Sequence, residues 1–122
     1  YFVRVSGDSP LIDSKILDKA IKISKNTKNK YDLITNVYPR TYPKGLSVEI
    51  IRTSILKKNL IKFTKSQKEH VTSYFYKNHN EFNIKNFKLN KKNKMKLSID
   101  TKSNLNFILK KFNKKDFNNF KI

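Results

Sequence analysis

The first 24 residues of the chain, YFVRVSGDSPLIDSKILDKAIKIS, decide the fold class. Residues 1–5 form an apolar run that is typical of a strand, and the Gly, Asp, Ser and Pro residues at 7–10 predict a turn that ends it. Asp13 or Ser14 can then cap a helix of about ten residues. The apolar positions of this helix predict one buried face: Ile16, Leu17, Ala20, Ile21 and Ile23. A strand, a turn and an amphipathic helix in this order indicate an α/β fold.

The same alternation continues along the chain. Residues 31–36 and 48–51 are typical of strands, and the stretch 37–45 between them is rich in turn residues. Helices are expected from residue 53 or 54 to residue 61, from near residue 66 through residue 75, and from about residue 101 onward. Residues 113–122 are weakly patterned.

An antiparallel hairpin is predicted between residues 84–89 and 95–99. Met95, Leu97 and Ile99 alternate strictly with polar residues, as in a strand with one buried face. The polar residues 90–94 would form the connecting loop. The predicted fold class is therefore α/β, with a partly parallel sheet and one antiparallel β-hairpin in a single small domain.

The composition excludes several kinds of site. The sequence has no cysteine, which rules out disulfides and thiolate metal sites, and its two histidines are too few for a histidine metal cage. Its two separated glycines, Gly7 and Gly45, form neither a Walker loop nor a dinucleotide fingerprint. No apolar run approaches the roughly 20 residues that cross a bilayer. No signal peptide is visible, although the chain opens on Tyr1 rather than Met.

The formal net charge of +19 makes a small polyanion-binding or RNA-binding module an alternative function. However, 25 of the 28 basic residues are lysines, whereas arginine is favoured for bidentate recognition of phosphates and bases. Lys, Asn and Ile, which have AT-rich codons, make up 53 of the 122 residues. This favours compositional drift in a genome of low GC content, and a nucleic-acid partner is not expected.

The sequence has only nine acids, and two of them follow predicted strands. Asp8 comes just after residues 1–5, and Asp100 comes directly after residues 95–99 and before a helix. Ligands of open α/β sheets bind at the carboxyl ends of strands, and carboxylates there suit Mg²⁺ together with substrate phosphates. The alternative is structural, with Asp8 as a turn residue and Asp100 beside a helix cap at Thr101.

Four further residues are candidates for ligand binding, each with a structural alternative. Arg40 lies in the turn-rich stretch, where its guanidinium could grip a carboxylate or a phosphate. Tyr42 could stack on a sugar or simply pack. Glu69 stands three residues after Ser66, which is the spacing of a helix capping box. His70 could bind substrate or be structural or exposed.

Four segments occur in one order along the chain: RVSGDSPLID at 4–13, NVYPRTYPKGLSVE at 36–49, KEHVT at 68–72 and LSIDT at 97–101. They resemble motifs of the cytidylyltransferase family, which includes the CMP-sugar synthetases and the spore-coat polysaccharide biosynthesis protein F group. In that group the patterns read R-I/V-S/T-G/A-D-x-P-L-I-D, S-N-x-x-P-R-T-Y-P-x-G-L-D-V-E, R-E-H-V-T and L-T-V-D-T. The resemblance covers roughly residues 1–110 at about the family's spacing.

The resemblance implies a Rossmann-like α/β sandwich similar to the nucleotide-diphospho-sugar transferases. It implies transfer of CMP from CTP to a sugar or sugar acid, with release of pyrophosphate, for surface polysaccharide synthesis in the cytoplasm. It also implies that Asp8 and Asp100 bind Mg²⁺ and that a homodimer is possible. The residues expected on the substrate side of the cleft are Arg40, Tyr42, Glu49, Glu69 and His70.

The chain also departs from the family patterns. Ser47 stands where the family has aspartate, Lys68 replaces an arginine, and residues 101–104 lack the acids of the family's T-P-E-D. The N-terminal half of the family domain, with its basic, glycine-containing nucleotide loop, has no counterpart. Residues 1–122 are therefore expected to be the C-terminal portion of a single cytidylyltransferase-like domain, and a catalytically inactive family member is a further alternative.

Overall fold

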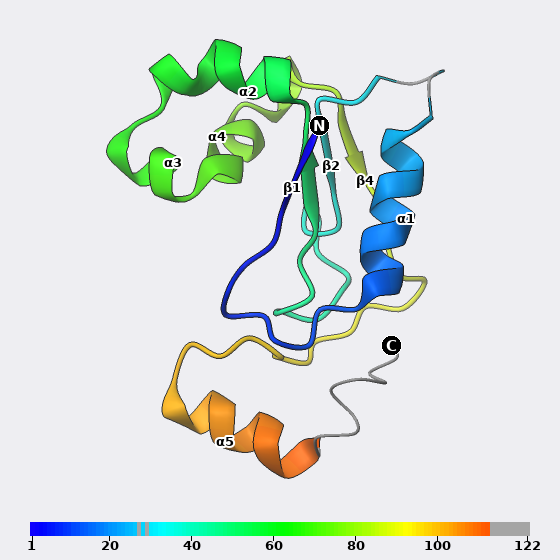
Figure 1. The fold of residues 1–122 in the computed structure, drawn as a ribbon, viewed down its shortest axis with the longest axis vertical. Helices are drawn as coiled ribbons and strands as arrows, with labels where there is room; N and C mark the ends of the chain where they lie inside the picture. The colour runs from blue at the N-terminus through cyan, green and yellow to red at the C-terminus, as the bar shows by residue number, and fades with distance from the viewer. Residues whose placement is uncertain (27, 29, 113–122) are drawn as a thin grey trace.

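A mixed four-stranded sheet forms the centre of the computed structural model, which describes residues 1–26, 28 and 30–112 (Figure 1). The strands are β1 (Phe2–Arg4), β2 (Leu33–Thr35), β3 (Glu49–Ile51) and β4 (Ile84–Asn86), in the spatial order β1-β3-β2-β4. Strand β3 runs antiparallel to both β1 and β2, and β2 runs parallel to β4. The predicted α/β class with a partly parallel sheet is confirmed.

Helix α1 (Ser14–Ser24) packs on one face of the sheet (Figure 1). Asp13 caps it as predicted, because its carboxylate accepts a hydrogen bond of 2.8 Å from the backbone N–H of Lys15. Ile16 and Ala20 are buried in the apolar cluster on this face. The predicted apolar stripe therefore docks the helix, since burial of apolar surface is favourable.

Two short helices, α2 (Thr53–Asn59) and α4 (Val71–Lys77), pack on the opposite face, and α3 (Lys65–Glu69) lies against α4. Two 3-10 turns accompany them, at Leu60–Lys62 after α2 and at His79–Glu81 after α4. The apolar cluster on this face is largely aromatic, and its buried members are Leu33, Ile51, Phe63, Tyr74 and Phe75. The sheet is thus covered by helices on both faces.

The capping box expected at Ser66 and Glu69 is formed instead by two neighbouring residues. The hydroxyl of Thr64 accepts a hydrogen bond of 3.2 Å from the backbone of Gln67, and the side chain of Gln67 accepts one of 3.0 Å from the backbone of Thr64. Glu69 is left exposed at the last position of α3. The backbone then leaves helical geometry at His70, so residues 66–75 form parts of two helices.

The hairpin predicted within residues 84–99 is wrong. Only β4 forms there, and the second segment bonds to Lys44 instead: the Lys44 N–H donates to the Met95 carbonyl (3.1 Å), and the Leu97 N–H donates to the Lys44 carbonyl (2.7 Å). Leu97 is buried and belongs to the core. The alternating pattern therefore indicates burial of Leu97. It does not indicate the hydrogen-bond partner of this segment, which is Lys44, far upstream in the sequence.

Gly45 allows this close approach. Its φ is +95°, in the left-handed region that favours glycine, and a Cβ atom at this position would lie 2.4 Å from the carbonyl carbon of Leu97. The backbone of residues 97–98 thus rests directly on residue 45 and leads the chain to Asp100.

Helix α5 (Lys102–Lys111) begins at Thr101, whose hydroxyl accepts a hydrogen bond of 3.2 Å from the backbone of Asn104. The predicted cap is confirmed. Of the apolar residues of this helix, Ile108 is buried, whereas Leu109 is 58% exposed. The weakly patterned tail, 113–122, lies outside the described residues. Within the described ranges, no helix combines the length and the apolar character that a bilayer span requires.

Candidate functional site

One rung of the sheet is polar across all four strands. Arg4 of β1 pairs in register with Glu49 of β3, Glu49 pairs with Thr35 of β2, and Thr35 pairs with Asn86 of β4. This rung lies where β1, β2 and β4 end. Directly opposed residues on neighbouring strands place their side chains on the same face. The sheet therefore presents a row of polar side chains across the ends of its strands.

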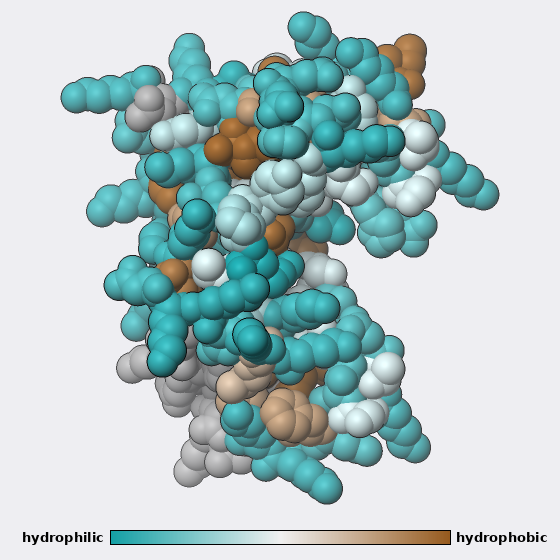
Figure 2. All heavy atoms as spheres, turned by 180° about the vertical axis from the view of Figure 1, so that it is seen from behind, coloured by the Kyte–Doolittle hydropathy of each residue, from teal (hydrophilic) through white to brown (hydrophobic). Residues whose placement is uncertain are grey.

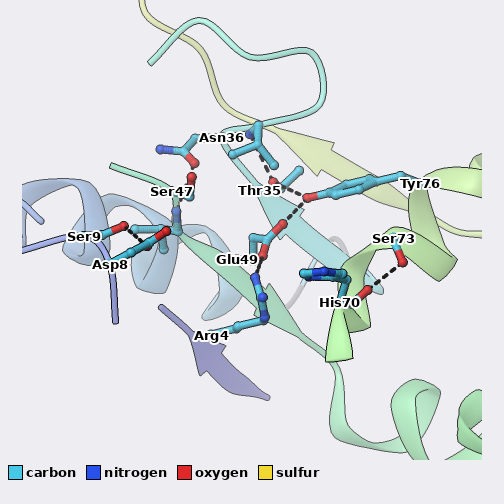
Figure 3. A network of polar contacts seen from close by, with 12 residues as sticks. Arg4, Asp8, Ser9, Thr35, Asn36, Ser47, Glu49, His70, Ser73 and Tyr76 are labelled. Carbon is cyan, nitrogen blue, oxygen red and sulfur yellow. Dashed lines mark hydrogen bonds and ion pairs between the residues drawn. The ribbon is translucent and has the colours of Figure 1, made fainter. Parts of the chain in front are cut away.

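Glu49 is the buried centre of this row (Figure 3). Its Oε2 atom lies 2.7 Å from Nη1 of Arg4, and its side chain is only 4% exposed. The hydroxyl of Tyr76, from α4, donates to Oε1 of Glu49 and lies 2.8 Å from the hydroxyl of Thr35. Burial raises the pKa of Tyr76 well above its ordinary value, and the charge of Glu49 raises it further. Tyr76 is therefore a neutral hydrogen-bond donor to a buried carboxylate.

A cavity of about 380 Å³ opens beside this row. It gathers charged groups of both signs from segments that are far apart in the sequence. The ionisable residues that line it are Arg4, Asp8, Arg40, Lys44, Glu49, Tyr76 and Asp100. Of the seven residues expected to bind metal or substrate, the structure thus brings four to one cavity: Asp8, Arg40, Glu49 and Asp100.

The segments that carry the two candidate metal ligands are joined directly. The backbone N–H of Ile99 donates to the carbonyl of Asp8 at 2.8 Å. The carboxylate of Asp8 accepts a hydrogen bond of 2.9 Å from Ser9, and that of Asp100 lies 2.6 Å from the ammonium of Lys96. The hydrogen bond from Lys96 lowers the pKa of Asp100. Among the described residues, no group of three His, Asp or Glu side chains is placed to hold a metal ion.

The loop that carries Arg40 fixes its guanidinium. One Nη atom donates to the carbonyl of Pro43 at 3.3 Å, and the other donates to the hydroxyl of Ser47 at 3.0 Å. Burial lowers the pKa of Arg40, and the nearby charge of Glu49 opposes that shift. Within the described part of the chain, Arg40 has no ion pair with a carboxylate.

Tyr42 lies in the core rather than at the cavity. It is 3% exposed, and its ring centroid lies 5.7 Å from that of Phe87 in an edge-to-face arrangement. Burial, and secondarily the charge of Asp13, raises its pKa. Of the two interpretations of Tyr42, packing is the one that the structure shows.

Glu69 and His70 do not line the cavity. Both are exposed where α3 meets α4. The His70 carbonyl accepts a hydrogen bond of 2.6 Å from Ser73, and Figure 3 shows the imidazole of His70 directed toward the side on which Glu49 lies. No hydrogen bond or ion pair between the His70 ring and another described residue accompanies this placement.

A larger hollow, of about 810 Å³, lies elsewhere on the surface. Lysine and asparagine dominate its lining, which includes Lys19, Lys88, Lys91, Lys92 and Lys94, and no acid contributes to it. Hydrophilic side chains also cover most of the face in Figure 2. We place the functional site at the smaller cavity because the motif residues and charges of both signs converge there.

Two members of the site, Arg4 and Tyr76, do not stand out as functional candidates in the sequence. Arg4 belongs to the first motif-like segment, RVSGDSPLID, but its role appears only through its register with Glu49. Tyr76 follows two core aromatic residues of α4, and no local pattern separates it from them.

Comparisons with known proteins agree on the family. A sequence profile of cytidylyltransferases matches residues 1–120. The chain is 33% identical over 105 residues to the uncharacterized protein MJ1063 of Methanocaldococcus jannaschii, a match that covers 81% of this chain and 40% of that protein.

A solved structure of a cytidylyltransferase from Leptospira borgpetersenii serovar Hardjo-bovis has the same fold. It aligns with a TM-score of 0.82 and 30% sequence identity, over 93% of this chain and 50% of the Leptospira chain. The chain therefore spans half or less of the length of the relatives it matches. From the profile match and the shared fold together, the chain belongs to the cytidylyltransferase family.

Proposed function

We propose that the protein containing this chain is a nucleotidyltransferase that transfers CMP from CTP to a sugar or sugar acid and releases pyrophosphate. The observation that carries the proposal is the hydrogen bond from Ile99 to Asp8, which brings Asp8 and Asp100 to one cavity in a chain of this family. The resemblance of the motifs supports the choice of CTP and of a sugar acceptor.

The donor set at Asp8 and Asp100 fits Mg²⁺. Both residues offer carboxylate oxygens, and the hydroxyls of Ser9 and Ser98 lie against them. Mg²⁺ in proteins is usually held by one or two carboxylates together with substrate phosphates and water, so a third protein carboxylate is not required. Asp8 and Asp100 would hold the ion, which neutralises phosphate charge when bound.

The reaction requires an oxygen of the sugar to attack the α-phosphorus of CTP. A new oxygen–phosphorus bond forms, the bond from the α-phosphorus to the bridging oxygen breaks, and pyrophosphate leaves. The attacking hydroxyl loses its proton to solvent water. Such a displacement depends mainly on alignment of the reactants. Arg40, which is fixed by Ser47 and Pro43, would bind and orient an anionic group of a substrate.

The wider setting follows from the family resemblance alone. We propose that the activated sugar serves surface polysaccharide synthesis in the cytoplasm, where CTP is available, and that the protein forms a homodimer. Glu69 and His70 would complete the acceptor side only through contacts with the substrate itself, because they do not line the cavity.

The test is pyrophosphate release from CTP, measured with a sugar-acid panel on the protein encoded by the complete reading frame that contains residues 1–122. Asp8→Asn and Asp100→Asn should each lower the rate by about 100-fold or more, and the activity should require Mg²⁺. Asp18→Asn is the matched control, because Asp18 is an exposed acid of α1 that does not line the cavity. Unchanged activity in Asp8→Asn would reject the metal assignment, and no release with any acceptor would reject the function.

A further inference from the structure

We propose that Arg4 and Arg40 form an anion-binding site beside the polar rung of the sheet. We further propose that Glu49 positions Arg4 and does not touch the ligand. The ligand is an oxyanion of a substrate, either a sugar carboxylate or a nucleotide phosphate. This proposal deepens the proposed function and rests on it for the identity of the substrates.

Arg4 retains free donors. A guanidinium carries five N–H groups, and among the described residues Arg4 makes a single side-chain hydrogen bond, from Nη1 to Glu49. Its side chain is 31% exposed and lines the cavity. The remaining N–H groups are therefore available to a ligand in the cavity, and a planar fork suits carboxylate and phosphate oxygens.

Glu49 is suited to hold Arg4 and is poorly placed to meet a ligand. Both of its carboxylate oxygens already accept hydrogen bonds, Oε2 from Arg4 and Oε1 from Tyr76. Thr35 fixes Tyr76 in turn through a contact of 2.8 Å between the two hydroxyls. This chain of contacts restricts the rotation of Arg4, so less conformational entropy is lost when the guanidinium binds an anion.

Arg40 supplies the second cation. Arg40 lines the same cavity as Arg4 and Glu49. Ser47 accepts one of its hydrogen bonds at the position where the family pattern has an aspartate. Because this partner is a neutral hydroxyl, Arg40 has no ion pair with a carboxylate among the described residues.

Arg52 provides an internal comparison. Nη1 of Arg52 lies 3.2 Å from Oδ1 of Asp32, and Arg52 does not line the cavity. Arg4, Arg40 and Arg52 are the three arginines of the sequence. A ¹H–¹⁵N spectrum of the arginine side chains therefore contains three Nε–H signals, which single Arg→Lys variants can assign.

The first experiment titrates the ¹⁵N-labelled chain with sodium pyrophosphate and, separately, with sodium glucuronate at an ionic strength of about 0.15 M. The Arg4 and Arg40 signals should shift in a saturable manner with at least one ligand, while the Arg52 signal stays in place. A response to pyrophosphate alone identifies a phosphate site, and a response to glucuronate alone identifies a carboxylate site. An unmoved Arg4 signal with both ligands overturns the proposal, as do equal shifts of all three signals.

The second experiment uses calorimetry to measure the affinity of the ligand that shifts the arginine signals. Arg4→Lys keeps the charge and loses the fork, so it should weaken binding about tenfold. Tyr76→Phe keeps the ring and frees one oxygen of Glu49, so it should weaken binding less and shift the Arg4 Nε signal of the free protein. If Arg52→Lys, the matched control, weakens binding as much as Arg4→Lys, general charge explains the affinity and the proposal fails. Pyrophosphate release from CTP that persists after such a failure would leave the proposed function standing.

Discussion

Nη1 of Arg4 lies 2.7 Å from Oε2 of Glu49, and the two residues are direct neighbours across the antiparallel pair of β1 and β3. The carboxylate is almost fully buried, whereas the guanidinium reaches the cavity. A buried carboxylate that loses its partner keeps its desolvation cost without compensation. The same ion pair therefore stabilises the pairing of β1 with β3 and holds the Arg4 guanidinium at the cavity.

Replacement of Arg4 by Met should destabilise the fold by about 3 kcal/mol, because it leaves the Glu49 charge buried with only neutral donors. The free energy of unfolding from urea titration at pH 7 measures this effect. In the double variant Arg4→Met/Glu49→Gln the loss should be clearly smaller than the sum of the two single losses. Strict additivity would contradict a direct coupling between the two side chains.

Gly45→Ala should destabilise the protein by more than about 2 kcal/mol, because the left-handed backbone and the missing space against Leu97 both oppose a Cβ atom. Gly7→Ala is the matched control, since a Cβ at residue 7 would meet no atom within 4 Å. Thermal and urea unfolding of the two variants provides the comparison. Equal stability of both variants would show that residues 97–98 do not rest on residue 45.

The stability of the protein should fall at high pH through Tyr76. Burial and Glu49 raise the pKa of Tyr76 in the folded protein, so its contribution is fully present below the unfolded value of about 10 and is lost as the pH rises above it. Unfolding measured between about pH 8 and pH 11 should therefore show a steeper decline for the parent chain than for Tyr76→Phe. Tyr31→Phe, which removes a hydroxyl outside this network, serves as the control. Parallel curves for all three proteins would refute the assignment.

Binding of polyanions should be weak, steeply dependent on salt and spread over the surface, because lysines occur on every α-helix of the described residues. Two sets of four Lys→Gln replacements provide the comparison, and each should lower the affinity for a short single-stranded RNA by the same amount. The first set is Lys88, Lys91, Lys92 and Lys94, and the second is Lys57, Lys58, Lys65 and Lys68 of α2 and α3. Fluorescence anisotropy at several salt concentrations provides the measurement. Loss of binding only in the first set would instead identify the lysine-lined hollow as a dedicated polyanion site.

The sequence was sufficient for features that depend on near neighbours. The α/β alternation, the cap of α1 at Asp13 and the cap of α5 at Thr101 follow from side chains within a few positions of each helix start. The rule that ligands gather where strands end also singled out Asp8 and Asp100. The structure brings both to one cavity, although Asp100 follows a single bridge rather than a strand.

The remaining features depend on partners that a local pattern does not specify. Strict alternation at Met95, Leu97 and Ile99 predicts burial of one side, but the hydrogen bonds of this segment go to Lys44 and Asp8. An aromatic residue in a turn-rich stretch can face solvent or core, and Tyr42 faces the core because it packs against Phe87. Tyr76 acts at the site only because α4 lies against the polar rung.

The polar rung also bears on how the protein folds. Arg4 and Glu49 are separated by 45 positions, and the hydrogen bond between Ile99 and Asp8 closes an even longer loop. Closing such loops costs chain entropy. Because Arg4 and Glu49 are partners in the pairing of β1 with β3, we expect the cavity to assemble in the same cooperative step as the sheet. A ligand that occupies it stabilises the entire fold by mass action, so its affinity also reports the fraction of molecules that are folded.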